Sequence, residues 1–248
     1  GGQTWEPPQN AQPPATCGAR AAAWGISFDD RGNGDVYVGT DCGLAVSQDH
    51  GLSWNHVDPV PNGTNDAVYA VAKHRILPLV VDVCGADGHH RGTWTDVGGT
   101  TQLVWSPTSN LPNGAECEPG AVHAIDVAPN LVSDDIYVAG ADGTVYGSDD
   151  GGATWTNLNA PGTTNRINFV RSYLSPDVVP TEYDLYFGTG TGPGPGGATT
   201  PAAIVRQRCS VTVGKLACAS GSWTQVAVGT HADTTDLAFD TLPSCPRY

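Results

Sequence analysis

Residues 47–54 read SQDHGLSW and residues 148–155 read SDDGGATW, which are two copies of the pattern S-x-D-x-G-x-[ST]-W. Residues 1–5 match the last five positions of this pattern, and weaker copies end at Trp105 and Trp223. The tryptophans that end these five copies are spaced 49, 51, 50 and 68 residues apart. A repeat of about 50 residues is typical of a protein built from repeated structural units.

Short runs of β-branched and aromatic residues recur within each repeat, bounded by Gly, Asp and Pro. One run reads DVYVG at 35–39, and its counterparts are DIYVA at 135–139 and DLYFG at 184–188. Runs of this length and composition indicate strands. Each repeat also has an apolar run before this strand, a third run after it, and a fourth run that starts at the tryptophan. Four strands per repeat form the blade of a β-propeller.

The sequence therefore predicts an all-β protein, a single β-propeller domain with four-stranded blades. Four complete blades are expected at residues 20–57, 66–109, 120–159 and 165–227, with Trp54, Trp105, Trp155 and Trp223 at equivalent positions. Residues 1–8 and 231–248 are expected to supply only strands of partial blades. These fragments either join into a fifth blade or belong to a larger propeller that another chain or subunit completes. We favour the larger assembly, because an open sheet edge needs to be covered.

The octapeptides resemble the Asp-box of the sialidase-type, BNR-repeat β-propellers, in which it joins the third and fourth strands of a blade. In such a turn the aspartates accept backbone N–H bonds, the glycines adopt positive φ and the tryptophans pack between blades. The resemblance implies that this turn lies on the face away from the ligand. We therefore assign a structural role to Ser47, Asp49, Gly51, Trp54, Ser148, Asp150, Gly152 and Trp155.

The charge balance excludes some classes of partner. The chain of 248 residues has 11 Lys and Arg against 25 Asp and Glu, a formal net charge of −14. A protein that binds nucleic acid by neutralising phosphates needs the opposite balance, and an anionic membrane surface is disfavoured for the same reason. No apolar run approaches the ~20 residues that span a bilayer, so we expect no membrane insertion.

Seven cysteines, none of them in a CxxC pair, favour disulfides over a zinc ribbon or a thioredoxin-type site. Disulfides in a chain with 32 Gly and 19 Pro indicate a secreted, extracellular protein. The loops before a first strand and after a second strand meet on one face of a blade. This geometry predicts the pairs Cys17–Cys42 and Cys84–Cys117, while Cys209–Cys218 would close a hairpin. Seven cysteines allow many other connectivities, and Cys245 has no partner in this scheme.

The loop face is where a ligand site is expected, because a rigid scaffold presents its loops there. Aligning the first strands places Trp24, Tyr69 and His123 at one position near the mouth of the central channel. The fourth blade has Arg166 or Asn168 at this position, and the last fragment has Thr235. Aromatic rings with polar tips suit the C–H faces and hydroxyls of sugars. The alternative is that these aromatic side chains only fill the channel.

The loops after the second strands add further candidates for ligand binding. The densest polar run is 85–91, and Asp82, His89 and Arg91 are the ligand-binding candidates in and beside it. His89 and His90 are adjacent, and neighbouring side chains on a strand point in opposite directions. Without a third spaced ligand we expect no metal site, and no cofactor is indicated.

Residues 25–45 are similar to the opening blade of the xyloglucanase family of glycoside hydrolases, where an Asp in a T-D-x-G-G-A context is the catalytic base. The resemblance implies that role for Asp41, although Cys42 and Leu44 depart from the pattern. An inverting glycosidase needs two carboxylates, and in that family the second lies in another propeller. A sialidase is disfavoured because Arg75, in the stretch that resembles its arginine motif, falls toward the wrong face.

Two functions remain open. The first is a secreted recognition propeller that binds a glycan or an extracellular protein on its loop face. The second is an extracellular glycoside hydrolase, xyloglucanase-like or sialidase-like, or a processed piece of one. A closed set of blades would favour recognition, and a second propeller with a facing Asp would favour hydrolysis.

Overall fold

The structure is a computed structural model. It describes residues 17, 22–29, 34–59, 66–74, 77–106, 111–112, 117, 124–129, 134–140, 143–159, 167–174, 182–189, 192–193, 199–200, 202–212, 215–218, 222–230 and 237. The partial strands expected at 1–8 and 231–248, together with Cys245, lie outside this part of the chain, except for Leu237. Among the described residues no helix is long and apolar enough to cross a membrane.

Four antiparallel four-stranded sheets form the four blades of a β-propeller, as the repeat predicts. Blade 1 contains β1 (Ala23–Phe28), β2 (Val36–Thr40), β3 (Gly43–Ser47) and β4 (Asn55–Val57). Blade 2 contains β5 (Val68–Lys73), β6 (Val80–Gly85), β7 (Gly88–Val97) and β8 (Thr100–Trp105). Blade 3 contains β9 (Ile125–Val127), β10 (Ile136–Ala139), β11 (Val145–Ser148) and β12 (Thr156–Asn157). Blade 4 contains β13 (Ile167–Tyr173), β14 (Glu182–Thr189), β17 (Ala202–Ser210) and β18 (Trp223–Thr230), with a small hairpin of β15 (Gly192–Pro193) and β16 (Thr199–Thr200) between β14 and β17.

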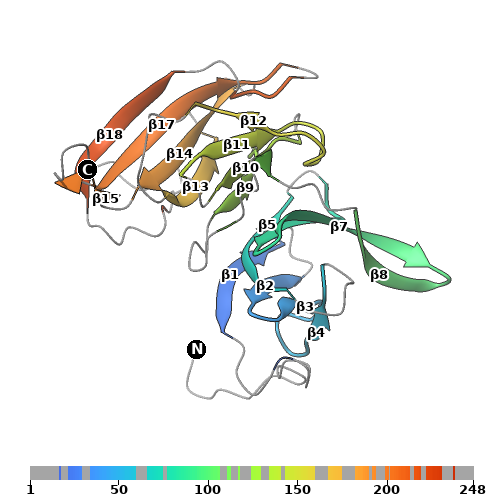
Figure 1. Ribbon diagram of the computed structural model, residues 1–248. Helices are drawn as coiled ribbons and strands as arrows, with labels where there is room; N and C mark the ends of the chain where they lie inside the picture. The colour runs from blue at the N-terminus through green and yellow to red at the C-terminus, as the bar shows by residue number, and fades with distance from the viewer. Residues whose placement is uncertain are drawn as a thin grey trace, which may run out of the picture.

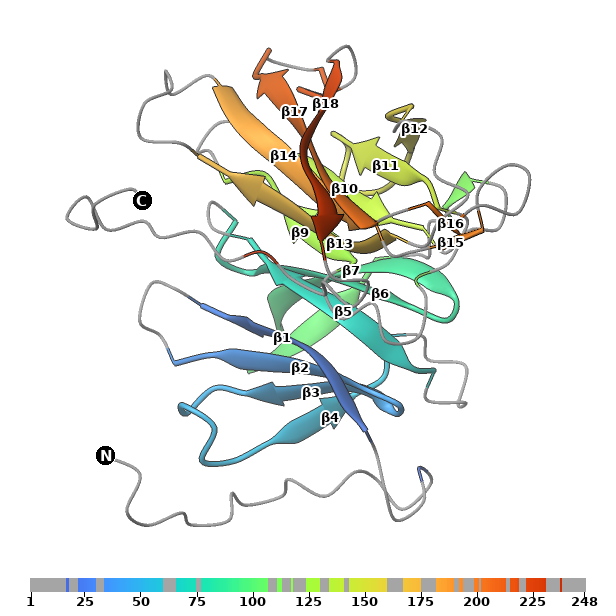
Figure 2. The same cartoon turned by 90° about the vertical axis from the view of Figure 1, so that its left-hand side faces the viewer.

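The blades follow one another in chain order, and their first strands lie on the inside. Strand β1 contacts β5, β5 contacts β9, and β9 contacts β13 (Figure 2). Apolar residues between the sheets form the core, in one cluster shared by blades 1 and 2 and a larger one shared by blades 2, 3 and 4.

One cross-strand register is common to all four blades. Val36 pairs with Ser47, and the matching pairs of second and third strands are Val81–Gly92, Ile136–Ser148 and Leu185–Gln207. A tryptophan lies opposite each of these third-strand residues. Trp105 pairs with Gly92 and Trp223 with Gln207. The strand pairing of the other two blades ends one residue short, and continuing it by one residue places Trp54 opposite Ser47 and Trp155 opposite Ser148. The expected equivalence of the four tryptophans is thus present in the register.

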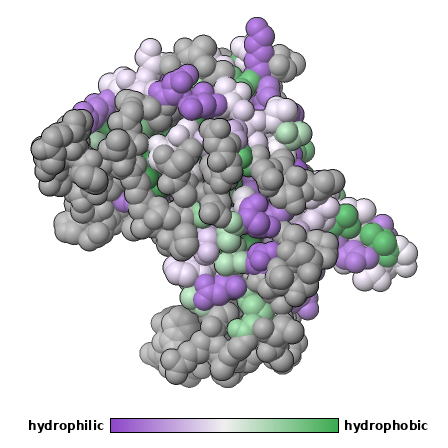
Figure 3. Space-filling model, in the orientation of Figure 1, coloured by the Kyte–Doolittle hydropathy of each residue, from purple (hydrophilic) through white to green (hydrophobic). Residues whose placement is uncertain are grey.

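Blade 2 differs from the sequence expectation at its outer edge. Residues 98–101 were expected to form a weak octapeptide copy before a strand that begins at Trp105, but Trp105 ends β8. Gly98 and Gly99 instead form the two-residue turn of a long hairpin, with φ of 65° and 84°. Positive φ at both positions is what a tight hairpin turn requires. Figure 1 shows β7 and β8 extending away from the rest of the molecule, and Figure 3 shows apolar residues on them.

Polar contacts at one register position join consecutive blades. The Tyr37 hydroxyl accepts a hydrogen bond from Trp94 Nε1 of blade 2 at 2.8 Å. The hydroxyls of Tyr137 in blade 3 and Tyr183 in blade 4 contact each other, and both donate to Asp135 Oδ2. Asp82 holds the same register position in blade 2. A buried polar group is costly unless it has a partner, so these contacts fix how neighbouring blades sit.

Candidate functional site

Three of the residues predicted for the loop face lie together in the structure. Trp24 Nε1 donates a hydrogen bond to Asp41 Oδ1 at 2.6 Å. The rings of Trp24 and Tyr69 meet edge to face, with their centroids 5.9 Å apart. Trp24 and Tyr69 are half-buried and Asp41 is exposed. We call this group, Trp24, Asp41 and Tyr69, the rim site.

Irregular pairing of the first strands positions the two aromatic residues. The register of β1 against β2 shifts between Ala23 and Ile26, and that of β5 against β6 shifts between Val68 and Ala70. An extra residue in one strand forms a bulge, which re-aims its side chain. Trp24 and Tyr69 fall in these bulges, at equivalent places in their blades.

The same shift occurs in β13 between Ile167 and Phe169, so the equivalent residue of blade 4 is Asn168. The register therefore favours Asn168 over Arg166, the other candidate from the sequence. Asn168 is 9% exposed. His123, Arg166 and Thr235 lie outside the described residues.

A tight turn between β2 and β3 holds Asp41. Thr40 Oγ1 accepts the N–H of Cys42 and donates to the carbonyl of Gly43, both at 3.0 Å. Gly43 has φ of 86°, and a Cβ there would lie 2.7 Å from the carbonyl oxygen of Val57. Only glycine fits such a position. Ala22 and Asp41 are also paired, because the N–H of Ala22 donates to Asp41 Oδ2 at 3.0 Å and the N–H of Asp41 donates to the carbonyl of Ala22 at 3.2 Å.

All three predicted disulfides are present: Cys17–Cys42, Cys84–Cys117 and Cys209–Cys218. The first joins the segment before β1 to the residue after Asp41, so it crosses the same two segments as the Ala22–Asp41 pairing. Disulfides of this number are typical of proteins that fold in an oxidising compartment.

The other predicted ligand-binding residues are not part of this rim. Asp82, His89 and Arg91 were expected on a loop, but they lie within β6 and β7. Asp82 is fully buried, His89 is 1% exposed and the Arg91 side chain is 12% exposed. The sheets of neighbouring blades cover both faces of such a strand, and the sequence of a single repeat does not show this burial.

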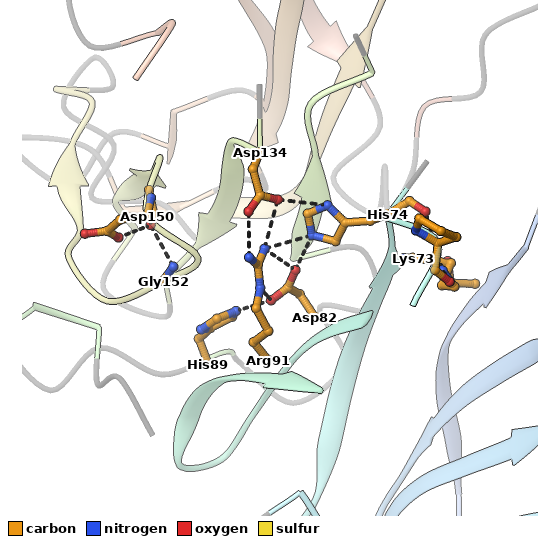
Figure 4. A network of polar contacts seen from close by, with 11 residues as sticks. Lys73, His74, Asp82, His89, Arg91, Asp134, Asp150 and Gly152 are labelled. Atoms are coloured by element: carbon orange, nitrogen blue, oxygen red, sulfur yellow. Dashed lines mark hydrogen bonds and ion pairs between the residues drawn. The ribbon is translucent and has the colours of Figure 1, made fainter. Parts of the chain in front are cut away.

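These three residues form a polar network between blades 2 and 3, together with His74 and Asp134 (Figure 4). Arg91 donates to Asp82 through Nε and Nη2, both at 3.0 Å, and to Asp134 through Nη1 at 2.6 Å. His74 contacts Asp82 through Nε2 and Asp134 through Nδ1, and His89 Nε2 lies 2.7 Å from Asp82 Oδ1. Sequence reasoning missed Asp134 because it belongs to the next blade, and it missed His74 because that residue follows β5 and lies outside the polar run.

The network shifts the pKa values of Asp82 and Arg91. Burial alone would raise the pKa of Asp82, but the charges and hydrogen bonds of His74 and His89 hold that pKa well below its usual range. Burial lowers the pKa of Arg91, and the carboxylates of Asp82 and Asp134 outweigh this and raise it. His90 belongs elsewhere, since its Nε2 lies 2.9 Å from Asp87 Oδ2. No group of three metal-ligating side chains with suitable placement occurs among the described residues.

Both octapeptides form the same hydrogen-bonded turn. Asp49 Oδ1 accepts the N–H of Ser53 at 2.8 Å, and Asp150 Oδ1 accepts that of Thr154 at 2.8 Å. Hydrogen bonds from the hydroxyl and N–H of Ser53 lower the pKa of Asp49 to about 2. These turns follow β3 and β11, whereas Asp41 precedes β3. The octapeptide carboxylates therefore lie at the opposite ends of the strands from the rim site.

Neither a family model nor a curated protein matches this chain. Solved β-propeller structures similar to it include the GH74 enzyme of Niastella koreensis, at 17% identity and a TM-score of 0.45 over 82% of this chain and 36% of that chain. The GH74 xyloglucanase from Xanthomonas campestris has 14% identity and a TM-score of 0.44, over 83% of this chain and 37% of that chain. YCF48 from Cyanidioschyzon merolae has 12% identity and a TM-score of 0.42, over 83% and 71%.

The chain thus spans little more than a third of the length of these two GH74 structures. Similarity at these identities and TM-scores does not indicate a function. The class that the sheets themselves define is the β-propeller, with four blades in the described part of the chain.

Proposed function

We propose that the chain is a secreted β-propeller of the Asp-box type that recognises a glycan at its rim site. One observation carries the proposal: two half-buried aromatic rings, Trp24 and Tyr69, stand beside the exposed carboxylate of Asp41. Aromatic faces pack on the C–H faces of sugar rings, and a carboxylate accepts hydrogen bonds from their hydroxyls.

Contacts within the protein hold the rim site in place. The Trp24 indole donates to Asp41, so the ring and the carboxylate fix each other, and the backbone of Ala22 binds the second carboxylate oxygen. Each oxygen of a carboxylate has two lone pairs, so both retain acceptor capacity for a hydroxyl. A pre-organised site loses less conformational entropy on binding.

Two further observations support the class and the compartment. The octapeptides form identical turns with the hydrogen bonds that the Asp-box resemblance implies. Three disulfides favour an oxidising environment, which supports secretion. An extracellular protein bound at the same rim is the other ligand class consistent with the proposal.

Replacing Trp24 by Ala should weaken glycan binding by about 1–3 kcal/mol, the scale of burying an aromatic side chain. A glycan array on the intact chain would find the ligand, and titration calorimetry would measure the loss.

Asp150→Ala is the matched control, because it removes a carboxylate with equally defined hydrogen bonds at the other ends of the strands. We expect it to lower the thermal unfolding midpoint and to leave the affinity unchanged. If Asp150→Ala abolished binding in folded protein while Trp24→Ala did not, the site would be on the other face.

Hydrolysis is the second candidate, and the rigidly held carboxylate of Asp41 is the observation that favours it. If the protein hydrolyses a glycan, Asp41→Asn should reduce turnover by about 10²-fold or more with little change in binding, as the loss of an acid–base group does. A reducing-sugar assay on the glycans found by the array would measure this. Absence of hydrolysis by the unchanged protein on every bound glycan would leave recognition as the function.

A further inference from the structure

A cavity with a volume of about 370 Å³ occurs away from the rim site. Its wall is made of consecutive residues near the carboxyl ends of β1, β5, β9 and β13. Trp24 and Tyr69 lie near the amino ends of β1 and β5, so the rim site and this cavity occupy opposite ends of the first strands. We call it the lower cavity.

Polar side chains of the lower cavity are fixed by contacts between and within blades. Ser27 Oγ accepts the N–H of Lys73 at 3.1 Å. At the equivalent position of blade 3, Asp126 Oδ2 accepts the N–H and the hydroxyl of Ser172 at 2.6 and 2.9 Å. Lys73 is 7% exposed, and its Nζ donates to the carbonyl of Pro78 at 2.5 Å. These contacts fix the groups relative to the wall of the cavity.

Three exposed apolar side chains belong to the wall of the lower cavity. Phe28 is 59% exposed, Ile26 47% and Leu174 37%, and all three line the cavity. An exposed aromatic ring next to fixed hydroxyl and carboxylate groups is the surface that a sugar ring fits.

The charges of the wall differ from those of the molecule. Lys73 and Arg171 are cations and Asp126 is the one carboxylate among the lining residues, in a chain whose net charge is −14. A concave, locally cationic wall attracts an anion. Arg171 occupies the same register position as Ser27 and Asp126 and completes that row in blade 4.

We propose that the lower cavity binds a small hydroxylated carboxylate, namely a uronic acid or a disaccharide that contains one. Arg171 and Lys73 attract the carboxylate, Asp126 accepts hydrogen bonds from hydroxyls, and Phe28 packs on the C–H face of the ring. Cavities from about 300 Å³ upward accommodate small-molecule ligands. This site is separate from the rim site, so neither proposal depends on the other.

Titration calorimetry of the intact chain with galacturonic acid, digalacturonic acid, galactose and inorganic phosphate tests the inference. We expect the two acids to bind and galactose and phosphate to bind at least about tenfold more weakly. Arg171→Gln should weaken binding of the acids by about tenfold or more, because it removes a charge-assisted hydrogen bond. The matched control is Arg208→Gln, which changes an arginine on β17 that is not among the lining residues and has a side chain 47% exposed.

A second variant keeps the proposal testable if Arg171→Gln does not fold. Phe28→Ser changes a largely exposed side chain and should also weaken the acids, whereas Trp24→Ala should leave them unaffected. The proposal is overturned if neither acid binds, if galactose or phosphate binds as tightly, or if Trp24→Ala rather than Arg171→Gln and Phe28→Ser removes binding.

Discussion

Arg91→Ala should lower the free energy of unfolding by about 3–5 kcal/mol, the cost of removing one partner from a buried ion pair. The substitution leaves Asp82 fully buried without the cation that binds both of its oxygens. It also removes the Arg91–Asp134 pair between the blades, while His74 still contacts both carboxylates (Figure 4). Denaturant unfolding followed by tryptophan fluorescence would measure the change.

The control for this substitution is Arg208→Ala. Arg208 also binds a carboxylate through two nitrogens, with Nε and Nη2 2.9 and 3.0 Å from Asp184. Its side chain is 47% exposed, and Arg206 lies 3.9 Å from the buried Asp184 as a second cation, so we expect a smaller cost than for Arg91→Ala. Equal costs for the two arginine substitutions would contradict the structural role that we assign to the network.

The contribution of the ionised Asp82 carboxylate to the free energy of unfolding should persist in mild acid. Its pKa is lowered in the folded state, so the stabilisation is present above the unfolded value, which is about 4. It is lost only as the pH falls through the lower, folded value. The difference in free energy of unfolding between the unchanged protein and the Arg91→Ala variant should therefore become smaller only below about pH 4.

Removing the Cys84–Cys117 disulfide by a double Cys→Ala substitution should lower the free energy of unfolding by about 4 kcal/mol, against about 3 kcal/mol for Cys209–Cys218. The two disulfides close segments of 33 and 9 residues, and the longer loop gains more freedom in the unfolded chain when its crosslink is removed. Denaturation of both variants under oxidising conditions gives the two costs. A larger cost for the 9-residue loop would show that native-state contacts, and not chain entropy, determine the order.

The repeat of tryptophans was enough to predict the blades, because each strand ladder is local in sequence and its register is set by pleat and turn. The disulfides were predictable for the same reason: alternate strand directions determine which loops meet. The rim site follows from aligning first strands, and the bulges at Trp24 and Tyr69 strengthen the alignment.

Contacts between blades were not predictable from a single repeat. Asp82 and Arg91 looked like loop residues beside a polar run, and Arg91 pairs with Asp134 of the next blade, which lies 43 residues further along the chain. Likewise, Gly98 and Gly99 resemble the glycines of the octapeptide. They form a hairpin turn instead, because the segments on either side of them pair continuously from Gly92 to Trp105. The lower cavity requires the ends of four strands, and no one of their sequences indicates it.

The blade-to-blade contacts described above join neighbours in the chain order, as in an array of repeats. In such an array, stability is a sum of blade terms and of coupling between adjacent blades. The Arg91 network contributes to the coupling between the second and third blades, beside the apolar cluster that they share. Weakening it should divide one cooperative unfolding unit into two, of which the first two blades and the last two are the natural halves.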